Sequence, residues 1–321
     1  MKYRIIRTLS KVTPFSIKMT NRSILITVLL LAWIGGCTRM PHTGITPLRP
    51  ASVAALDRYL IEHKADLDQF RLRGPFTVIT HENFELALSP AEHINTDLYL
   101  TASNEKAPLV ILLHGLDSTK DDHTFQAMHL ATWGIHCLAV QLPGEGPWVN
   151  NGKTLARIAA FVHRAPEALD SRIDANRIVL AGHSYGGSAV AIALASGAPA
   201  AGGILLDPAG IGPQMPQYLR RIDKPVIVLG ADRQVSATFD RDHFYRYIRG
   251  GIAEVSIRDA AHEDAQYPSH SGHATEELQI SFVSALTAAA FSLGVTGKFD
   301  YAWASFGGPL ENGSFFGAKR K

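Results

Sequence analysis

The amino-acid sequence predicts an α/β protein with a mostly parallel central sheet and helices on both of its faces. The first observation is an alternation, from about residue 107 onward, of short apolar runs with longer segments of helical periodicity. The second is the run Leu-Val-Ile-Leu-Leu at 109–113, which has no polar position, as is typical of a strand buried on both faces. Strands that alternate with helices are joined by crossover connections, so they lie parallel to one another.

Each element follows from its own pattern, in chain order. Apolar residues recur at helical spacing after Ser52 (Val53, Leu56 and Leu60), which predicts a first helix with Ser52 at its N-cap. Strands are expected at 76–79, 84–88, 96–100, 109–113, 135–140, 178–181, 203–206, 226–229 and 253–257. Helices are expected at 123–133, 155–169, 185–196, 241–249 and 276–293. The segment 298–321 mixes aromatic residues with glycine and predicts no element.

Length and composition place the chain among globular proteins with a substantial core. Of its 321 residues, 46% are apolar and 19% are charged. The net charge of +2 combines six basic residues without an acid in the first 36 residues with −4 in the rest. The basic character belongs to that leader, so nothing predicts a nucleic-acid partner.

The first 36 residues have the pattern of a secretory signal. A basic region that ends at Arg22 precedes an uncharged apolar run at 24–34. This run is shorter than the roughly 20 residues that span a bilayer, and it fits the apolar region of a signal, about 7–15 residues long. Because the basic region is long for a signal, translation starts either at Met1 or at Met19.

The apolar run ends in Ile34-Gly35-Gly36-Cys37, which resembles the lipobox of bacterial lipoproteins. That resemblance implies that Cys37 is lipidated and becomes the mature N-terminus, which would anchor the chain to a membrane of the cell envelope. The alternatives are a signal that is simply cleaved and a single membrane anchor. With Cys37 acylated, the second cysteine, Cys137, has no disulfide partner, and it is expected to be buried.

These patterns divide the chain into four parts. Residues 1–36 form the signal peptide, and residues 37–51, which include three prolines, form a tether. Residues 52–295 form the α/β domain, and residues 296–321 form a C-terminal tail.

Gly182-His183-Ser184-Tyr185-Gly186 is a G-x-S-x-G motif between an expected strand and an expected helix. The motif alone is weakly specific, since glycine and serine are common residues. Its context is more specific, because glycines allow the sharp strand-to-helix turn that presents a serine hydroxyl beyond the carboxyl edge of a sheet. Ser184 is therefore the candidate nucleophile.

From about residue 76 to 293 the sequence resembles the α/β-hydrolase superfamily. Besides the serine motif, the step His114-Gly115 follows an expected strand, and a Pro-Gly-x-Gly turn follows the next strand at 143–146. The resemblance implies an α/β-hydrolase fold, and the short connection between its sixth and seventh strands implies that no large cap domain is present there. It also implies that the backbone N–H groups of Leu116 and Tyr185 form an oxyanion hole.

A base and an acid complete the constellation that the superfamily uses. His262 follows the last expected strand, where the superfamily places its base. Two acids stand at strand ends, Asp207 and Asp232. Most members take the acid from the seventh strand, often three places after a glycine, but Arg233 holds that place here. Platelet-activating-factor acetylhydrolases and several lipases take it from the sixth strand, and the turn at 207–210 is similar to that of the lipases, so we favour Asp207 and keep Asp232 as the alternative.

The resemblance implies a Ser184–His262–Asp207 serine hydrolase that cleaves carboxylic esters without a cofactor. Cutinases, polyester hydrolases, chlorophyllases and acetylhydrolases have open clefts, and their similarity indicates a small-molecule or lipid-like, bulky or polymeric ester. Thioesters and amides stay open as substrates. A non-catalytic binding lipoprotein of the envelope and a lyase that uses the same pocket stay open as other classes. The run 121–123, Asp-Asp-His, lacks a second set of ligands at suitable spacing, so no metal site is expected.

Overall fold

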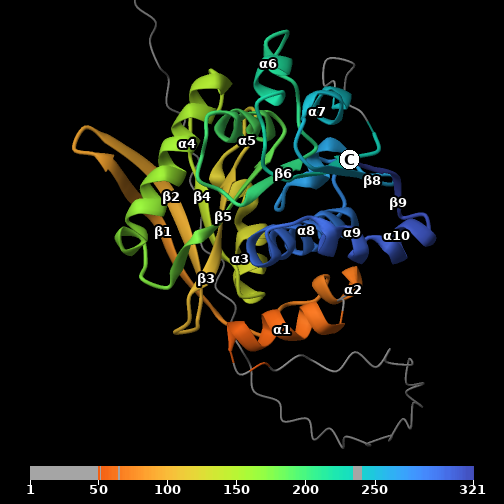
Figure 1. The fold of residues 1–321 in the computed structure, drawn as a ribbon, viewed down its shortest axis with the longest axis horizontal. Coiled ribbons are helices and arrows are strands. Elements are labelled where there is room, and N and C mark those ends of the chain that lie inside the picture. Colours follow the sequence, from red (N-terminus) through yellow and green to blue (C-terminus); the bar gives the residue numbers. More distant parts are fainter. Residues whose placement is uncertain (1–49, 51, 64–65, 234–240) are drawn as a thin grey trace, which may run out of the picture. The chain divides into compact units, whose positions relative to one another are not determined.

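The computed structural model describes residues 50, 52–63, 66–233 and 241–321. The chain divides into two units, residues 1–44 and 45–321, and the described elements all belong to the second unit (Figure 1). The expected signal peptide, Cys37 and the tether up to residue 49 lie outside the described residues, so what the sequence predicts for them stays a prediction.

Nine strands form one sheet in the described part of the second unit, in the spatial order β1-β2-β4-β3-β5-β6-β7-β8-β9. The strands from β4 through β3, β5, β6 and β7 to β8 run parallel, whereas β1, β2 and β9 pair antiparallel at the two edges. The strands are β1 (Val78–Ser89), β2 (Glu92–Thr101), β3 (Ala107–Leu113), β4 (His136–Val140), β5 (Ile173–His183), β6 (Gly202–Leu206), β7 (Val226–Ala231), β8 (Ile252–Ile257) and β9 (Phe315–Arg320). The predicted mostly parallel sheet is confirmed.

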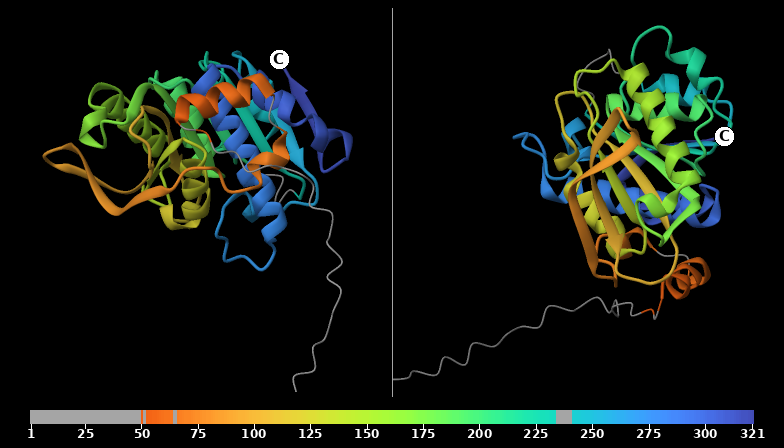
Figure 2. Two further views of the ribbon diagram at one scale, coloured as in Figure 1. Left: turned by 90° about the horizontal axis from the view of Figure 1, so that it is seen from below. Right: turned by 90° about the vertical axis from the view of Figure 1, so that its left-hand side faces the viewer.

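Helices cover both faces of the sheet (Figures 1 and 2). One face carries α4 (Trp148–Arg164), α5 (Tyr185–Ala195), α6 (Met215–Leu219) and α7 (Asp242–Tyr247). The other face carries α1 (Val53–His63), α2 (Leu67–Phe70), α3 (Thr124–Thr132), α8 (Glu276–Phe291), α9 (Asp300–Ser305) and α10 (Gly307–Glu311). Each face has its own hydrophobic cluster between helices and sheet. This three-layer arrangement is the α/β-hydrolase fold that the sequence predicts, and α6 is the only described helix between β6 and β7.

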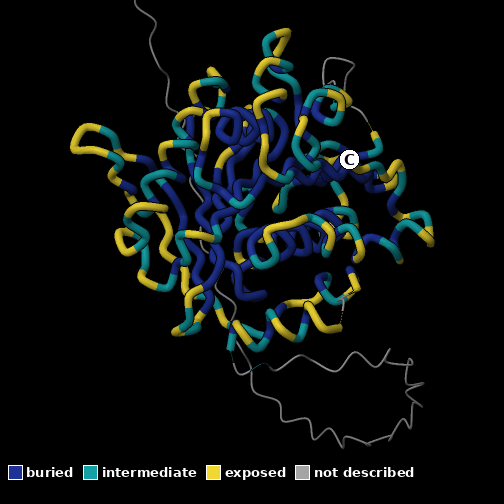
Figure 3. Tube along the Cα trace, in the orientation of Figure 1, coloured by how far each residue is buried: buried dark blue, intermediate teal, exposed yellow. Residues whose placement is uncertain are grey.

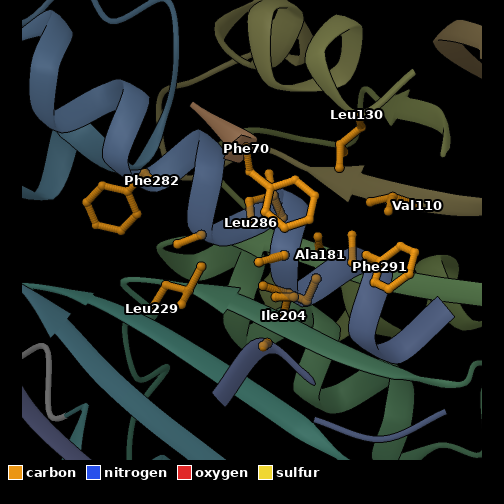
Figure 4. Close-up of a cluster of buried hydrophobic side chains, with 14 of the residues drawn as sticks. Phe70, Val110, Leu130, Ala181, Ile204, Leu229, Phe282, Leu286 and Phe291 are labelled. Carbon is orange, nitrogen blue, oxygen red and sulfur yellow. The ribbon is translucent and has the colours of Figure 1, made fainter. Parts of the chain in front are cut away.

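Helix α8 belongs to the core rather than to the surface (Figure 4). Its residues Phe282, Leu286 and Phe291 share one buried cluster with Val110 of β3 and Leu229 of β7. Full burial of a leucine or phenylalanine side chain stabilises a fold by about 1.5–3 kcal/mol. The helix and its continuation to Thr296 are long and apolar enough to cross a membrane, but 78% of that apolar window is buried inside the domain.

The strands at the centre of the sheet are buried (Figure 3). The candidate site lies at their carboxyl ends. All seven residues of β3 are buried, as the unbroken apolar run predicts. In a parallel sheet the carboxyl ends of neighbouring strands meet at one edge, where ligands bind. The residues that follow β3, β5, β6 and β8 are therefore brought to the same edge although they are far apart in sequence.

Two expected strands, 76–79 and 84–88, form the single long strand β1. The reason is an irregularity in its middle, where Asn83 has a φ of 52° and the register against β2 shifts between His81 and Phe84. The side chain of Asp97 accepts a hydrogen bond of 2.7 Å from the backbone N–H of Asn83 and stabilises this kink. A polar kink inside one strand has the sequence pattern of a turn between two strands.

The C-terminal segment, for which the sequence predicts no element, continues the fold. It contains α9, α10 and the edge strand β9, which pairs with β8. Phe306 and Phe315 are buried and anchor the segment in the core. Because Phe315 is the only buried residue of β9, this strand has no alternation of apolar and polar positions from which it could be predicted.

Candidate active site

Ser184 stands on a sharp turn between β5 and α5. Its φ of 56° and ψ of −124° lie in a region that residues other than glycine rarely adopt, at a cost of about 1–3 kcal/mol. The two glycines of the motif make the turn sterically feasible. A Cβ on Gly182 would lie 2.5 Å from the carbonyl oxygen of Gly186, and a Cβ on Gly186 would lie 2.3 Å from the carbonyl oxygen of His114. The backbone around Ser184 therefore requires glycine at both positions.

The loop after β3 lies directly beside this turn. A Cβ on Gly115 would lie only 3.0 Å from the Cβ of Ser184, so the loop backbone approaches the serine as closely as a glycine allows. Leu116, the next residue, lines the same cleft as Ser184 and Tyr185. The structure thus brings together both residues whose N–H groups were predicted to form an oxyanion hole.

The turn that carries Asp207 is hydrogen-bonded to the turn that carries Ser184. The backbone N–H of Ser184 donates to the carbonyl of Leu206 at 2.9 Å, and the N–H of Ala209 donates to the carbonyl of Ser184 at 3.1 Å. Asp207 itself has a φ of 38°, another strained value for a residue with a side chain. These bonds hold the carboxyl end of β6 against the end of β5.

His262 begins the short helix η3 (His262–Ala265) just after β8, and its ring meets Asp207. The Nδ1 atom of His262 lies 2.6 Å from Oδ2 of Asp207, and the two side chains are each 13% exposed. With the Nδ1 proton donated to the carboxylate, Nε2 is the basic nitrogen of the ring. Of the two predicted acids, Asp207 is therefore the one bonded to His262. The other, Asp232, accepts a hydrogen bond of 3.1 Å from the backbone N–H of Asp259.

Asp207 is held as a carboxylate by its neighbours. Burial raises its pKa, but the hydrogen bond and charge of His262, the charge of Arg241 and the N–H of Ala231 outweigh burial and leave the pKa below its ordinary value. The bond from Ala231 measures 2.9 Å and that from Arg241 measures 2.6 Å, both to Oδ1. An ionised acid beside the ring is what a histidine base requires, because it stabilises the imidazolium.

His183, which precedes Ser184, contacts the loop of His262 from β5. Its Nε2 donates a hydrogen bond of 3.0 Å to the backbone carbonyl of His262, and the two rings lie 4.5 Å apart. Burial lowers the pKa of His183 far below its usual range, and the nearby rings of His262 and His123 lower it further. His183 is thus a neutral donor that positions the backbone of His262, a contact that sequence proximity to Ser184 did not reveal.

The loop that carries Leu116 is anchored by a buried ion pair. Nζ of Lys120 lies 2.9 Å from Oδ2 of Asp97, and neither side chain is more than 7% exposed. Further along, Oδ2 of Asp122 accepts bonds from the hydroxyl of Ser118 at 2.7 Å and from the N–H of Thr119 at 2.8 Å. The sequence did not point to Lys120 and Asp97, because charged residues are ordinarily exposed to solvent.

Ser184 and His262 open into a cleft of about 290 Å³. The cleft is lined by Leu116, Asp117, Ser118, Asp122, His183, Ser184, Tyr185, His262, Glu263, Gln266, Ser269, His270 and Ser271. Three of these carry carboxylates, and none of the lining residues is a lysine or an arginine. A larger cavity of about 670 Å³ between α2, α8 and α10 is lined by none of the candidate residues.

The same edge of the sheet carries histidine and carboxylate side chains, which are common metal ligands. Among the residues that the structure describes, no group of three or more histidine, cysteine, aspartate or glutamate side chains is arranged to hold a metal ion. Asp122 instead caps the loop at Ser118 and Thr119. Cys137 is buried in β4, and burial raises the pKa of its thiol.

Comparison with known proteins gives one family. A family model described as "Alpha/beta hydrolase family" matches residues 110–307, which is more than half of the chain. No curated protein matches the chain. The matched range contains the turn of Ser184, both predicted acids and His262.

Proposed function

The chain belongs to the alpha/beta hydrolase family, and on that premise we propose that it is a serine hydrolase that cleaves carboxylic esters through an acyl-enzyme intermediate. One observation carries the proposal: Ser184 occupies a strained turn in the same cleft as His262, whose ring is hydrogen-bonded to the buried carboxylate of Asp207. Strained backbone at a cleft beside a histidine–carboxylate pair is typical of a nucleophile and its base.

In this mechanism the hydroxyl oxygen of Ser184 attacks the ester carbonyl while Nε2 of His262 takes its proton. Asp207 keeps the ring in the required tautomer and stabilises the imidazolium. The N–H groups of Leu116 and Tyr185 bind the oxyanion of the tetrahedral intermediate. When the intermediate collapses, the alcohol leaves with the proton from His262. Water then attacks the acyl-enzyme with His262 as base, which releases the acid and restores Ser184.

The cleft supports a neutral ester as the substrate. Its carboxylates, Asp117, Asp122 and Glu263, are not accompanied by a lysine or arginine among the lining residues. An anionic substrate, such as a coenzyme A thioester with its phosphates, is repelled by such a lining. Leu116, 45% exposed, offers an apolar contact for a lipid-like or bulky acyl group at the mouth of the cleft.

The leader sequence supports a place for the reaction at the cell envelope. A lipidated Cys37 would tether the hydrolase to a membrane of the bacterial envelope, where it would meet lipid-like or polymeric esters. A globomycin-sensitive shift of the precursor on a gel, lost in Cys37→Ser, supports the anchor. Processing of the precursor that globomycin does not affect, and that is the same in Cys37→Ser, argues for a signal that is simply cleaved.

The chemistry is tested by the intact mass of the purified chain after exposure to a fluorophosphonate, together with turnover of p-nitrophenyl esters. We expect a single adduct that is absent in Ser184→Ala, and turnover that collapses in Asp207→Asn and persists in Asp232→Asn. The matched pair of acid variants removes one charge at a strand end in each case. Folded wild-type chain that gives neither adduct nor turnover would contradict the proposal and favour a non-catalytic binding protein. Turnover of amides or thioesters above that of esters would revise the substrate class.

A further inference from the structure

We propose that Arg241 is a positioning residue for this hydrolysis, whose guanidinium fixes the carboxylate of Asp207 in the orientation that serves His262. The inference rests on the proposed function of the same site. Arg241 precedes α7 and lies 34 residues from Asp207 in sequence. No motif in the sequence points to it, and the contact arises only because α7 packs near the ends of β7 and β8.

Several hydrogen-bond partners hold the guanidinium of Arg241 at once. Its NH1 atom donates to Oδ1 of Asp207 at 2.6 Å and to the carbonyl of Ala231 at 2.8 Å. NH2 donates to the hydroxyl of Ser256 at 2.9 Å, and Nε donates to Oε1 of Glu254 at 3.3 Å. The side chain of Arg241 is only 12% exposed. A planar guanidinium with these four hydrogen-bond partners holds its position far better than the side chain of a surface arginine does.

The sheet leaves room for this guanidinium. A Cβ on Gly230 would lie 2.2 Å from NH1 and 2.3 Å from Cζ of Arg241, so a side chain at that position would displace the arginine. Gly230 pairs with Ser256 across β7 and β8, which places the bare backbone next to the hydroxyl that Arg241 uses. The ends of β7 and β8 therefore form the binding position of the guanidinium.

The two carboxylate oxygens of Asp207 accept hydrogen bonds from different partners. Oδ1 accepts from Arg241 and from the N–H of Ala231, while Oδ2 accepts from His262 at 2.6 Å. Two fixed donors on one oxygen prevent the carboxylate from rotating, so the other oxygen stays aimed at the ring. An ordinary carboxylate held by one donor would not be fixed in this way.

The charge of Arg241 is itself balanced, which protects the electrostatic role of Asp207. A lone arginine beside Asp207 would weaken the attraction between the carboxylate and an imidazolium. Here Glu254, buried in β8, shares the guanidinium with Asp207. Lys319 of β9 lies 3.3 Å from the other oxygen of Glu254, within ion-pair distance but without the geometry of a hydrogen bond. The alternating charges extend from the site to the C-terminal strand.

The test is a double-mutant cycle on the full chain, with Arg241→Met, Asp207→Asn and both together. The folded fraction of each preparation is measured by circular dichroism and thermal unfolding, so that a loss of folded protein does not count as a loss of turnover. We expect Arg241→Met to lower kcat by roughly 10- to 100-fold with KM within about twofold, as for a misplaced catalytic group. In the Asp207→Asn background, Arg241→Met should change kcat by less than about twofold, because the group through which it acts has lost its function.

Three further variants test whether the effect comes from the position of the guanidinium. Arg241→Lys keeps the charge and loses the fork, so it should recover only part of kcat. Gly230→Ala should lower kcat without removing any functional group, because its Cβ displaces the guanidinium. Arg246→Met, the same change at an exposed position of α7, should leave kcat unchanged. In proton spectra the low-field signal of the bond between His262 and Asp207 should weaken in Arg241→Met and persist in Arg246→Met.

The outcomes separate this inference from the proposed function. An adduct on Ser184 together with wild-type kcat in Arg241→Met would overturn the role of Arg241 and leave the hydrolase intact. An equal loss of kcat in the wild-type and Asp207→Asn backgrounds would also overturn it, because the arginine would then act independently of Asp207. No adduct in the folded wild-type chain would overturn both.

Discussion

The side chain of His183 and the backbone of His262 are joined by a hydrogen bond of 3.0 Å, from Nε2 to the carbonyl oxygen. The bond ties the strand that ends at the candidate nucleophile to the loop that carries the candidate base. Their rings also lie 4.5 Å apart at an interplanar angle of 40°. The residue before Ser184 thus helps to set the position of a residue 79 places later in the chain.

His183→Phe tests this bond, because phenylalanine keeps an aromatic ring and removes the donor. One hydrogen bond contributes about 1 kcal/mol net, so kcat for a p-nitrophenyl ester should fall about fivefold with KM nearly unchanged. Steady-state kinetics on titrated active sites measure this. His183→Gln, which can donate through its amide, should recover part of the loss. Wild-type kcat in His183→Phe would contradict the positioning role.

Gly186→Ala should disrupt the loop after β3 as well as the turn of Ser184. The added Cβ would lie 2.3 Å from the carbonyl oxygen of His114, a backbone atom that cannot rotate away. Overpacking of this kind destabilises a protein by about 1–3 kcal/mol, which thermal unfolding measures. We also expect turnover to fall at least about tenfold, since the shifted loop carries Leu116. Gly307→Ala, where nothing lies within 4 Å of the new Cβ, is the control and should be neutral or slightly stabilising.

The buried ion pair between Lys120 and Asp97 should be worth far more than a surface pair. Lys120→Met leaves the carboxylate of Asp97, 2% exposed, without its cation, which costs about 3–5 kcal/mol of unfolding free energy. Arg157→Met is the matched control, because Arg157 pairs with Glu92 at the surface, where the side chains are 54% and 32% exposed. That pair should contribute at most about 1 kcal/mol. Equal losses in the two variants, measured by denaturant unfolding, would contradict the assignment.

Acid should destabilise the fold partly through His136. Burial lowers its pKa to about 4, and its neutral ring accepts a hydrogen bond of 3.0 Å from the N–H of Thr101 through Nδ1. The unfolded chain takes up the proton near pH 6.5, so the folded state binds fewer protons between about pH 6.5 and pH 4 and loses stability as the pH falls.

His136→Gln isolates this effect, because glutamine does not titrate and its amide oxygen can accept from Thr101. The unfolding free energy of the wild type minus that of the variant should decrease on acidification from pH 6.5 to 4, by at most about 1.4 kcal/mol per pH unit. Urea unfolding at several pH values measures the difference. A difference that stays constant across this window would show that His136 does not carry the linkage.

Much of the fold could be predicted from the sequence, because it depends on local patterns. The unbroken apolar run of β3 and the alternation of strands with helices are typical of a parallel sheet. The edge strands were harder to predict. Strand β1 contains a kink at Asn83 that has the pattern of a turn, and β9 buries only Phe315.

For the candidate site, the sequence by itself determined where a strained serine must lie. Gly182 and Gly186 surround Ser184 where a strand gives way to a helix, and only that backbone needs glycine at both positions. His262 could be predicted from its place after the last strand. The sequence favoured Asp207 over Asp232 but did not decide between them. Both residues follow parallel strands, so both lie at the same edge of the sheet.

Only the tertiary structure decided which acid meets the ring and what holds it there. Asp207 is turned toward His262 by a positive φ and by the bonds that fasten its turn to Ser184, whereas Asp232 bonds to the backbone of Asp259. Arg241 bonds to Asp207 although the two residues are 34 positions apart in the sequence. Its guanidinium occupies the space that a side chain at Gly230 would fill. Local patterns specify strands and turns, because their physics involves neighbours in sequence. Side-chain partners at the sheet edge depend on how distant elements pack, and no local pattern contains that information.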